Sequence, residues 1–500
     1  MREDERGQAL VIGAIALLAV AIMVLASVAV GNGVYQKIKL QDAADAQAYT
    51  TAVKEARAYN FFAYTNRAMV VHYCAMLTFM SYLSHAYYLK NTVGRAAGVL
   101  QYVPYIGAVF VVVKQLIDRW MDIVDALTQA LVPILTALNI ALWLAQEAML
   151  AATSADLALV GTSTALEKTD PKALPYRAMS QGGVSGAIGA LQMAGLNFLN
   201  ADAFLRQIDD VQGVDRLGIT TRGKLLSSSA NKLSDEKMFK YRELMGNIAN
   251  SARRRWTAVG KGPTLIGRKW SINLLVIKVN KRAMSEIKSF SERFENNRRD
   301  QLFASEDIRI KLCGVKCKTK FTYHIGVAAD HRDGYHTEGI GMWASKTAKH
   351  HPWLGITPFM LSRPTFGDPH LRKFGQPNNL VVVTKDMIGK RGVWELKSRS
   401  LYGWTGEFED SGTLNMSWDR VGGNSGIAVR HRTGGMMALS NARAVYHRPL
   451  AWREEPNFFN PLWEARLAPL ETNPANRMAL FALIPEYQTL RAVDSRLFNY

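Results

Sequence analysis

The sequence lacks the residue patterns on which several large enzyme classes depend. No Gly-x-Ser-x-Gly elbow and no His-Glu-x-x-His motif occurs in its 500 residues, which argues against those hydrolase and zinc-peptidase classes. Residues 262–269 come close to a phosphate-binding loop, but arginine follows Gly267 and no Ser or Thr follows the lysine. The Asp-x-Ser-x-Ser signature of metal-dependent adhesion domains is also absent, since Asp410-Ser411-Gly412 does not satisfy it. We therefore expect no catalytic residues, no bound metal and no cofactor.

Cysteine is scarce, with three in the chain. Cys74 lies in an apolar helical stretch, where a small buried side chain is expected. Cys313 and Cys317 frame a glycine-containing turn between two strand-like runs, and we predict that they form a disulfide in an oxidising compartment. A zinc site would need two further ligands, for which His324 is one candidate and no second stands out.

Charge is absent from residues 9–30, which are almost wholly apolar. A helix needs about 20 such residues to cross roughly 30 Å of hydrocarbon, whereas a signal peptide has a shorter apolar core followed by a cleavage site. The alternative is a buried core helix. We predict a membrane anchor whose representative residues are Ala9, Leu10, Leu17, Leu18, Val24, Leu25 and Val30.

Glycine and proline are both absent from residues 34–93, which predicts long helix. One continuous helix over this stretch would measure roughly 90 Å. A break near Asn60 or Asn66 is equally compatible with the sequence. Gly31 and Gly33 predict a flexible point where the helix leaves the membrane.

Two further apolar segments, residues 96–113 and 126–145, contain Pro104, Gly107, Pro133 and Asn139. Each is near the lower length limit for a spanning helix. We expect a hydrophobic helical hairpin that packs on the long helix or lies at the membrane surface. A re-entrant or spanning hairpin remains an alternative.

The rest of the chain changes from helical to strand-like character. Residues 236–252 and 281–297 have helix-like sequences, whereas residues 272–279 resemble one buried strand. Later strand-like runs are separated by Gly, Pro, Asn and Asp and cover residues 308–312, 318–325, 380–385, 392–397 and 442–447. We predict an α+β fold with an anchor (1–33), long helices with the hairpin (34–165), a mixed and mainly helical region (166–304) and a β-rich C-terminal domain (305–500).

The net charge of +19 is the main compositional anomaly. It favours anionic lipid, an acidic partner or nucleic acid. The basic residues are dispersed, and the two tight arginine groups, residues 253–255 and 298–299, lie in no nucleic-acid motif, so no specific nucleic-acid partner is expected. Acidic and histidine residues at 330–338 invite comparison with a metal site, but we interpret them as a solvated loop.

Several stretches resemble one protein family. Residues 6–11, the apolar helix and residues 39–46 resemble the N-terminus of TadG-like proteins of the tight-adherence (Flp, type IVc) pilus assembly machinery. Residues 60–70 and residues 446–449 and 457–467 resemble later parts of such proteins. The residues that carry these later matches most clearly are Asn66, Arg67, Ala68, Met69, Asn460, Pro461 and Trp463. Residues 96–150 resemble an insertion.

The resemblance implies a single-pass anchor in the bacterial inner membrane, a periplasmic bulk and a part in assembling or tethering a pilus. Other pilin-like or assembly proteins would pack against the N-terminal helix. Pilins of this system are cut after a glycine that has glutamate five residues beyond it, but counting from Gly7 that position is Ile12. We therefore expect an uncleaved anchor.

Two other functions remain open at this stage. The chain could be a membrane-anchored adhesin whose C-terminal domain recognises a ligand, or a DNA-uptake component that uses its positive charge. The positive charges that flank the anchor, Arg2 and Arg6 against Lys37 and Lys39, are nearly balanced. The periplasmic orientation is therefore an expectation that rests on the resemblance.

Overall fold

The computed structural model describes most of the helical half of the chain and the strands of the other half. The described residues are 4–160, 163–171, 173–175, 197–205, 248–252, 269–274, 276–288, 301–313, 317–331, 336–338, 345–347, 353, 356–357, 359–360, 362, 378–385, 436–446 and 456–469.

Helices fill the first third of the chain, and strands dominate the described residues of the remainder. The helical elements are α1 (Asp4–Leu89), a π-helical turn (Lys90–Gly94), α2 (Arg95–Leu100), α3 (Gly107–Ala155), a second π-helical turn (Asp156–Val160) and α4 (Ser163–Thr169). The strands are β1 (Ala173–Pro175), β2 (Trp270–Leu274), β3 (Ile277–Lys288), β4 (Gln301–Cys313), β5 (Cys317–His331), β6 (His336–Glu338), β7 (Ser345–Thr347), β8 (Asn378–Lys385), β9 (Met436–Tyr446) and β10 (Trp463–Leu467).

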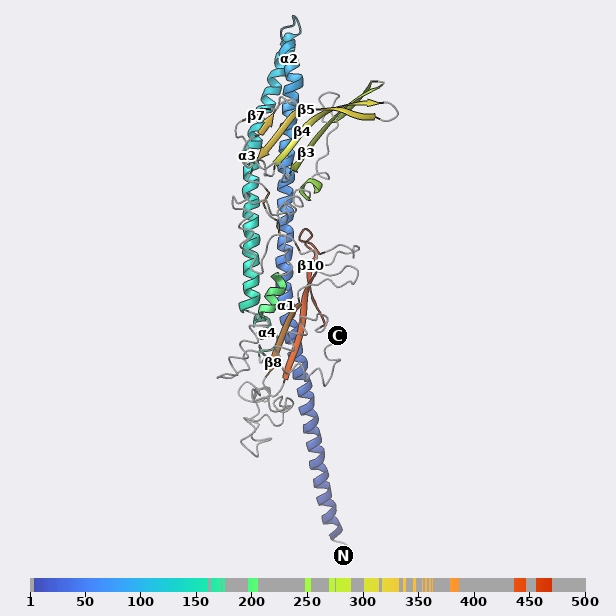
Figure 1. The fold of residues 1–500 in the computed structure, drawn as a ribbon. Helices are drawn as coiled ribbons and strands as arrows, with labels where there is room; N and C mark the ends of the chain where they lie inside the picture. Colours follow the sequence, from blue (N-terminus) through green and yellow to red (C-terminus); the bar gives the residue numbers. More distant parts are fainter. Residues whose placement is uncertain are drawn as a thin grey trace.

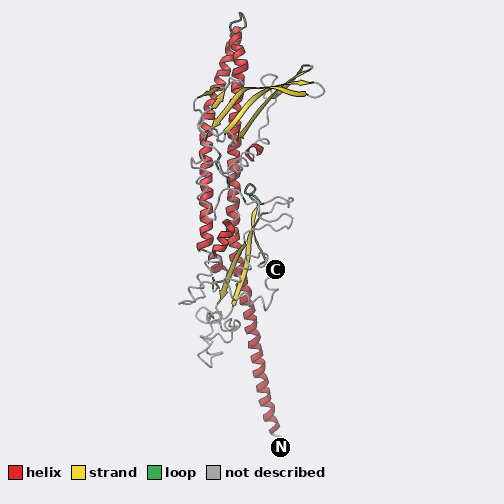
Figure 2. Ribbon diagram, viewed as in Figure 1, coloured by secondary structure: helices red, strands yellow, loops and turns green. Residues whose placement is uncertain are grey.

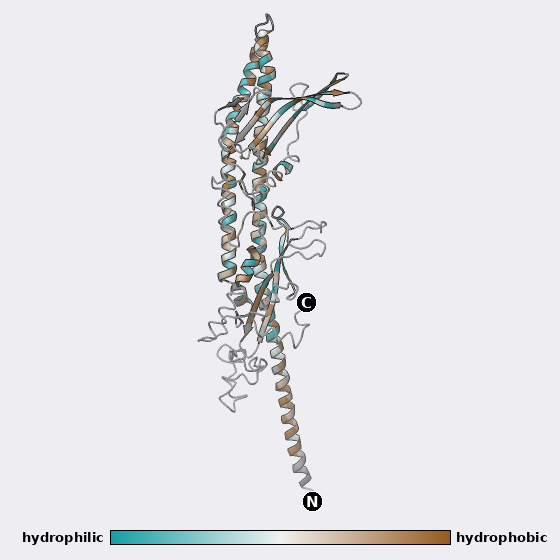
Figure 3. Ribbon diagram, in the orientation of Figure 1, coloured by the Kyte–Doolittle hydropathy of each residue, from teal (hydrophilic) through white to brown (hydrophobic). Residues whose placement is uncertain are grey.

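Helix α1 is one uninterrupted rod of 86 residues, which at about 1.5 Å per residue measures roughly 130 Å. The sequence left open a break near Asn60 or Asn66, and α1 continues through both. It also continues through Gly31 and Gly33, so the predicted flexible point lies within regular helix. Its first part projects alone from the rest of the molecule and is apolar all round (Figures 1 and 3). This part is long and apolar enough to cross a membrane, and none of it is buried.

Helix α3 returns beside α1 in the opposite direction, so the two form a long hairpin (Figure 1). Residues 126–145 lie within α3, whose inner face packs on α1, as the packed-hairpin interpretation expected. Residues 96–113 do not form a helix of their own. They make up α2, the turn and the start of α3 at the end of the molecule farthest from the N-terminus.

Two four-stranded antiparallel sheets lie along α1 (Figure 2). One has the order β2-β3-β4-β5 and is a simple meander near the far end of the hairpin. The other has the order β1-β8-β9-β10 and lies closer to the N-terminal part of α1. Strands β6 and β7 form a separate pair. The architecture is therefore α+β, with the sheets in the C-terminal half apart from the short β1.

Some expectations from the sequence were wrong. Residues 281–288 belong to β3 and not to a helix, because all twelve residues of β3 pair with β4 in register, and that pairing overrides the local helix propensity of Lys, Arg, Ala and Glu. Residues 272–279 are not one buried strand but the two arms of the β2–β3 hairpin, whose tip is exposed.

The expected domain limits cut through elements of the fold. Residue 165 lies inside α4, residue 304 lies inside β4, and β1 joins a sheet whose other strands lie more than two hundred residues later. Four of the expected strands are present, within β4, β5, β8 and β9. Residues 392–397 lie outside the described part of the chain, as do all but the last five residues of the expected helix 236–252.

The core is organised around α1 between Leu40 and Tyr87. Its first stretch is rich in buried alanine and packs on Val381, Val383, Ala438 and Ala442 of the β8–β9 sheet. Its middle packs on aromatic residues from the C-terminal segments, and its last part packs on α3 and on the β3–β5 sheet. One helix thus holds three successive parts of the core, each against a different partner.

Candidate functional site

The candidate site is the surface of α1 to which the C-terminal segments are attached. Asn60 donates from Nδ2 to the carbonyl of Trp463 at 2.8 Å and accepts from the Trp463 N–H at 3.0 Å. An asparagine amide has the same donor and acceptor groups as a peptide, so it can pair with a strand residue as a neighbouring strand would. Because β10 is an edge strand, Asn60 satisfies backbone groups that no strand covers.

Asn66 makes a denser set of hydrogen bonds of the same kind. Its Nδ2 donates to the carbonyls of Met360 at 2.6 Å and Phe458 at 2.8 Å. Its Oδ1 accepts from the Met360 N–H at 3.2 Å and from Nε2 of Gln146 in α3 at 2.8 Å. The side chain is fully buried and uses all its donor and acceptor positions. It therefore joins α1, α3 and two C-terminal segments at one point.

The same device occurs at two other places. Asn200 binds both the N–H and the carbonyl of Leu380 in β8, each at 3.1 Å. Asn250 binds both groups of Ile287 in β3, at 2.8 and 3.0 Å. In each case the pairing lies beyond the end of the shorter neighbouring strand. We call these four contacts the asparagine clamps: Asn60–Trp463, Asn66–Met360, Asn200–Leu380 and Asn250–Ile287.

Aromatic side chains fill the space around the Asn60 and Asn66 clamps. The Tyr59 ring lies 5.2 Å from Phe204, 5.2 Å from Phe458 and 4.7 Å from Trp463, measured between ring centroids. Asn457 shapes the turn that precedes β10, because its Oδ1 accepts the N–H groups of Phe459 and Asn460 at 3.0 Å each. The cluster is buried, and its polar groups are hydrogen-bonded, so α1 and the C-terminal segments are held in one fixed arrangement. We call this contact region around Asn60 and Asn66 the joint.

The sequence stretches around Asn66 and Trp463 meet at this joint although nearly 400 residues separate them in the chain. Asn66 and Trp463 are both buried there, Met69 lies in the neighbouring core cluster, and Asn460 and Pro461 form the turn before β10. Arg67 is exposed and Ala68 is half-buried, so the motif includes side chains outside the joint. The anchor residues Ala9, Leu10, Leu17, Leu18, Val24, Leu25 and Val30 are all exposed along α1.

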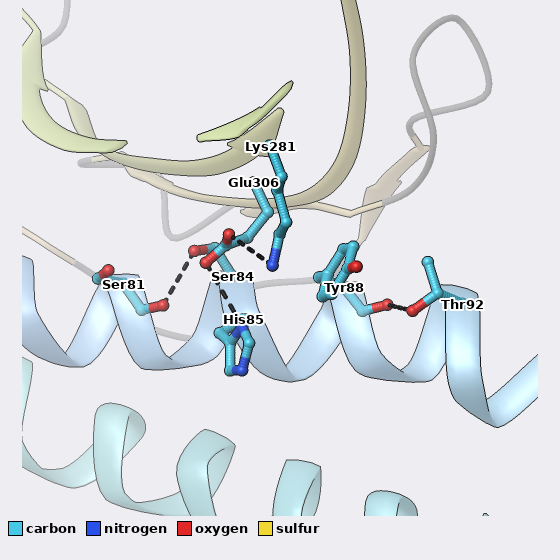
Figure 4. Close-up of polar contacts among 7 residues, drawn as sticks. All are labelled: Ser81, Ser84, His85, Tyr88, Thr92, Lys281 and Glu306. Carbon is cyan, nitrogen blue, oxygen red and sulfur yellow. Dashed lines mark hydrogen bonds and ion pairs between the residues drawn. The ribbon is translucent and has the colours of Figure 1, made fainter. Parts of the chain in front are cut away.

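A second polar cluster lies where α1 meets the β3–β5 sheet (Figure 4). Lys281 Nζ lies 3.2 Å from Oε2 of Glu306 and 3.4 Å from the centroid of the Tyr88 ring. His85 Nδ1 lies 3.5 Å from the other Glu306 oxygen. Burial, with a further contribution from the Glu306 charge, raises the pKa of Tyr88. The Lys281 and Glu306 side chains are 0% exposed, so this pair neutralises charge between α1 and the sheet and cannot reach a substrate in solution.

The approach of the sheet to α1 at this cluster requires a glycine. A Cβ at Gly326 of β5 would lie 2.2 Å from the backbone oxygen of Ser84 and 2.7 Å from the backbone nitrogen of Tyr88. Such contacts do not occur in folded proteins, so any larger residue would push β5 away from α1. Asn91 adds a hydrogen bond from its Nδ2 to the carbonyl of Ile325 at 3.0 Å.

Glu55 is a buried carboxyl group on the same helix. Asn379 donates to its Oε2 at 2.7 Å. Burial raises the pKa of Glu55 well above its usual range, and the hydrogen bond from Asn379 opposes that shift to a smaller extent. A neutral carboxylic acid is therefore the form that the fold accommodates.

Sequence reasoning missed Glu55, Asn60, His85, Lys281 and Glu306 as interaction sites. The helical spacing of apolar residues on α1 could have identified Glu55, and it also marks Asn66, which was singled out from the sequence. Glu55 and Asn66 recur at helical spacing with Ala44, Ala48, Tyr59 and Phe62, and so share the face that is buried. No such signal marks Lys281 or Glu306, because their burial depends on where the sheet is placed.

The cysteines follow the expected pattern in part. Cys74 is a buried thiol whose Sγ lies 3.9 Å from the carbonyl oxygen of Ala249, and Cys313 is disulfide-bonded. Cys313 and Cys317 lie opposite each other in the β4–β5 register, which supports their pairing as a prediction. His324, weighed as a zinc ligand, has its Nδ1 2.6 Å from Oδ1 of Asp307. His331 ends β5, and His336 and Glu338 form β6, so their backbones are strand and not loop.

Comparison with known proteins gives no match to a protein-family model, to a curated protein or to a solved structure. Within the described residues, no group of three or more His, Cys, Asp or Glu side chains is arranged to hold a metal ion.

Proposed function

We propose that the chain is a membrane-anchored, pilin-like structural component of a type IVc (tight-adherence) pilus assembly or related secretion system, with its bulk on the periplasmic side of the bacterial inner membrane. The observation that carries the proposal is the continuity of α1. The same helix presents an apolar surface over residues 9–30, which no described part of the chain covers, and then becomes the spine of the folded part.

A continuous helix suits an assembly role because it keeps its two ends at a fixed distance and orientation relative to each other. A partner helix that packs beside residues 9–38 would be held in register with the joint at Asn60 and Asn66, since no flexible linker separates the two regions. Two of the asparagine clamps, those at Asn60 and Asn66, attach C-terminal segments directly to this helix. The resemblance to TadG-like proteins supplies the identity of the assembly, and the geometry supports a structural role within it.

The proposal is tested by deletion and complementation in the source bacterium. Deletion should abolish or impair piliation, and the wild-type gene should restore it. Ala46→Pro should fail to restore it, because proline within the helix costs about 3 kcal/mol or more and redirects everything beyond it. Ala46→Gln keeps a good helix former at the same position and should restore piliation, with protein abundance compared by blotting.

Other outcomes would assign the chain to another function. Normal piliation with lost surface adhesion in the deletion strain would favour the adhesin. Loss of activity in His331→Ala, His336→Ala or Glu338→Ala at normal abundance would reveal a metal or catalytic site. Retardation of DNA by the purified protein at physiological salt would favour DNA uptake.

A further inference from the structure

The end of the helical hairpin is an exposed apolar cap. Residues 96–113, here called the apical turn, contain no charged residue. They lie at the end of the molecule opposite the N-terminus (Figure 1). Val99 is 72% exposed, Tyr102 is 82% exposed and Tyr105 is fully exposed. Exposed turns of soluble proteins usually carry Gly, Asn, Asp or Ser, so an apolar and aromatic turn in this place calls for a partner.

The apical turn is built as a fixed structure. The N–H of Gly107 bonds to the carbonyl of Val103 at 2.9 Å, and a Cβ at Gly107 would lie 2.1 Å from the carbonyl oxygen of Gln101. Tyr105 has a positive φ of 72°, which is unfavourable for a bulky residue. Tyr105 is therefore both exposed and held in a strained backbone conformation. Strained residues of this kind cluster at functional sites.

Several backbone N–H groups of the apical turn form hydrogen bonds within the turn itself. The N–H groups of Gln101, Tyr102, Val103, Gly107 and Val109 all bond to carbonyls of the turn itself. Entry into a hydrocarbon region requires such internal pairing, because each unsatisfied backbone group would cost several kcal/mol there. The polar side-chain groups of the turn are limited to Gln101 and two tyrosine hydroxyls, and tyrosine is typical of the boundary between lipid and water.

Basic residues flank the apical turn on both sides in the sequence. Lys90 and Arg95 precede it and Lys114 and Arg119 follow it, and all four are exposed. Asp118, which is half-buried, is the one acidic residue in the interval 90–119. An apolar turn flanked by positively charged residues complements a bilayer whose surface carries anionic headgroups.

We propose that the apical turn inserts into the surface of a second, anionic lipid bilayer, so that the protein joins two membranes. Residues 31–100 form a nearly continuous helical path of roughly 100 Å between the anchor and the turn. Since α1 is straight enough to keep the two ends apart, the turn points away from the bilayer that holds the anchor (Figure 1). This role is additional to pilus assembly and depends only on the anchor.

The test uses the full-length chain, held by its anchor in nanodiscs, and measures flotation with added vesicles. Vesicles of phosphatidylcholine with phosphatidylglycerol should carry the protein upward, and empty nanodiscs should not float. The double variant Val99→Asp, Tyr102→Asp should lose flotation by about tenfold or more, because two exposed apolar contacts with lipid become charged. Arg95→Gln and Lys114→Gln should each weaken flotation by about fivefold at low salt.

The matched control lies on the same hairpin. Leu144→Asp changes an exposed leucine of α3 far from the turn, and it should float as the wild type does. Equal helical content by circular dichroism would show that each variant is folded.

Three outcomes would overturn the proposal. They are absence of flotation of the wild type, unchanged flotation of the Val99/Tyr102 variant, and wild-type dimerisation in detergent that this variant abolishes. The third would assign the turn to a second copy of the chain. Normal piliation in any of these cases would leave the proposed assembly function standing.

Discussion

Two parts of α1 differ in environment although they belong to one uninterrupted helix. Residues 9–30 are uncharged, almost wholly apolar and exposed, and no described segment of the chain packs on them. Residues 40–88 include many alanines and several amides, and they contribute to three core clusters that join α1 to α3 and to both sheets. Apolar character alone therefore does not predict burial within a protein. For the first part we propose a lipid bilayer as the partner, whereas the second part packs on the protein itself.

The largest effect should come from charging the exposed part. Leu17→Arg with Leu18→Arg places two guanidinium groups near the centre of the proposed anchor, at about 3 kcal/mol each. We expect the protein to move from the membrane fraction to the carbonate-soluble fraction. Tyr35→Arg, which lies beyond the anchor and is also exposed, should leave the protein in the membrane. Retention of the double variant in the membrane would contradict the anchor.

The next effect concerns the buried charges at the far end of α1. Lys281→Met leaves the Glu306 carboxylate without its nearest cation, and we expect a loss of about 4 kcal/mol in the free energy of unfolding. Urea denaturation in detergent measures it. Lys281→Met combined with Glu306→Leu removes both charges and should recover most of the loss. If the double variant is as unstable as the single one, the pair is not what limits stability there.

A slightly smaller effect is expected at the central clamp. Asn66→Leu removes the partner of the Met360 backbone and of the Phe458 carbonyl, and buried groups left unsatisfied cost about 1–3 kcal/mol each. We expect a total near 3 kcal/mol by the same denaturation assay. Arg67→Leu, on the exposed side of the same helical turn, should stay within about 0.5 kcal/mol of the wild type. Equal effects of the two substitutions would contradict the joint.

The smallest effect is a pH dependence at Glu55. Because its pKa is raised on folding, the folded state holds a proton that the unfolded state releases above the usual glutamate value of 4.5. Stability therefore falls as pH rises, by up to about 1.4 kcal/mol per pH unit until the folded-state pKa is reached. Glu55→Gln should abolish this slope and be more stable than the wild type at neutral pH. The exposed Glu464→Gln should keep the slope, and a wild-type stability independent of pH above 4.5 would refute the assignment.

Local signals predicted several helices and strands but not how they are arranged. The absence of Gly and Pro from residues 34–93 predicted a helix that is present, and four strand-like runs lie in strands. Residues 281–288 were wrongly assigned because their composition favours helix while their pairing with β4 decides the outcome. Sequence patterns singled out motif residues of the joint, including Asn66. They did not predict that these residues meet, because the contact between Asn66 and residues 360 and 458 depends on long-range topology.

The central claim is that residues 9–30 lie in lipid and that residues 31–89 of α1 lie on the periplasmic side of that bilayer. Val20 and Tyr49 are matched probes, because their side chains are 54% and 46% exposed in the folded chain. In right-side-out spheroplasts, a membrane-impermeant maleimide should label Tyr49→Cys and should label Val20→Cys only after detergent is added, with wild-type labelling subtracted. Equal labelling of both without detergent, or labelling of Tyr49→Cys only in inside-out vesicles, would contradict the account.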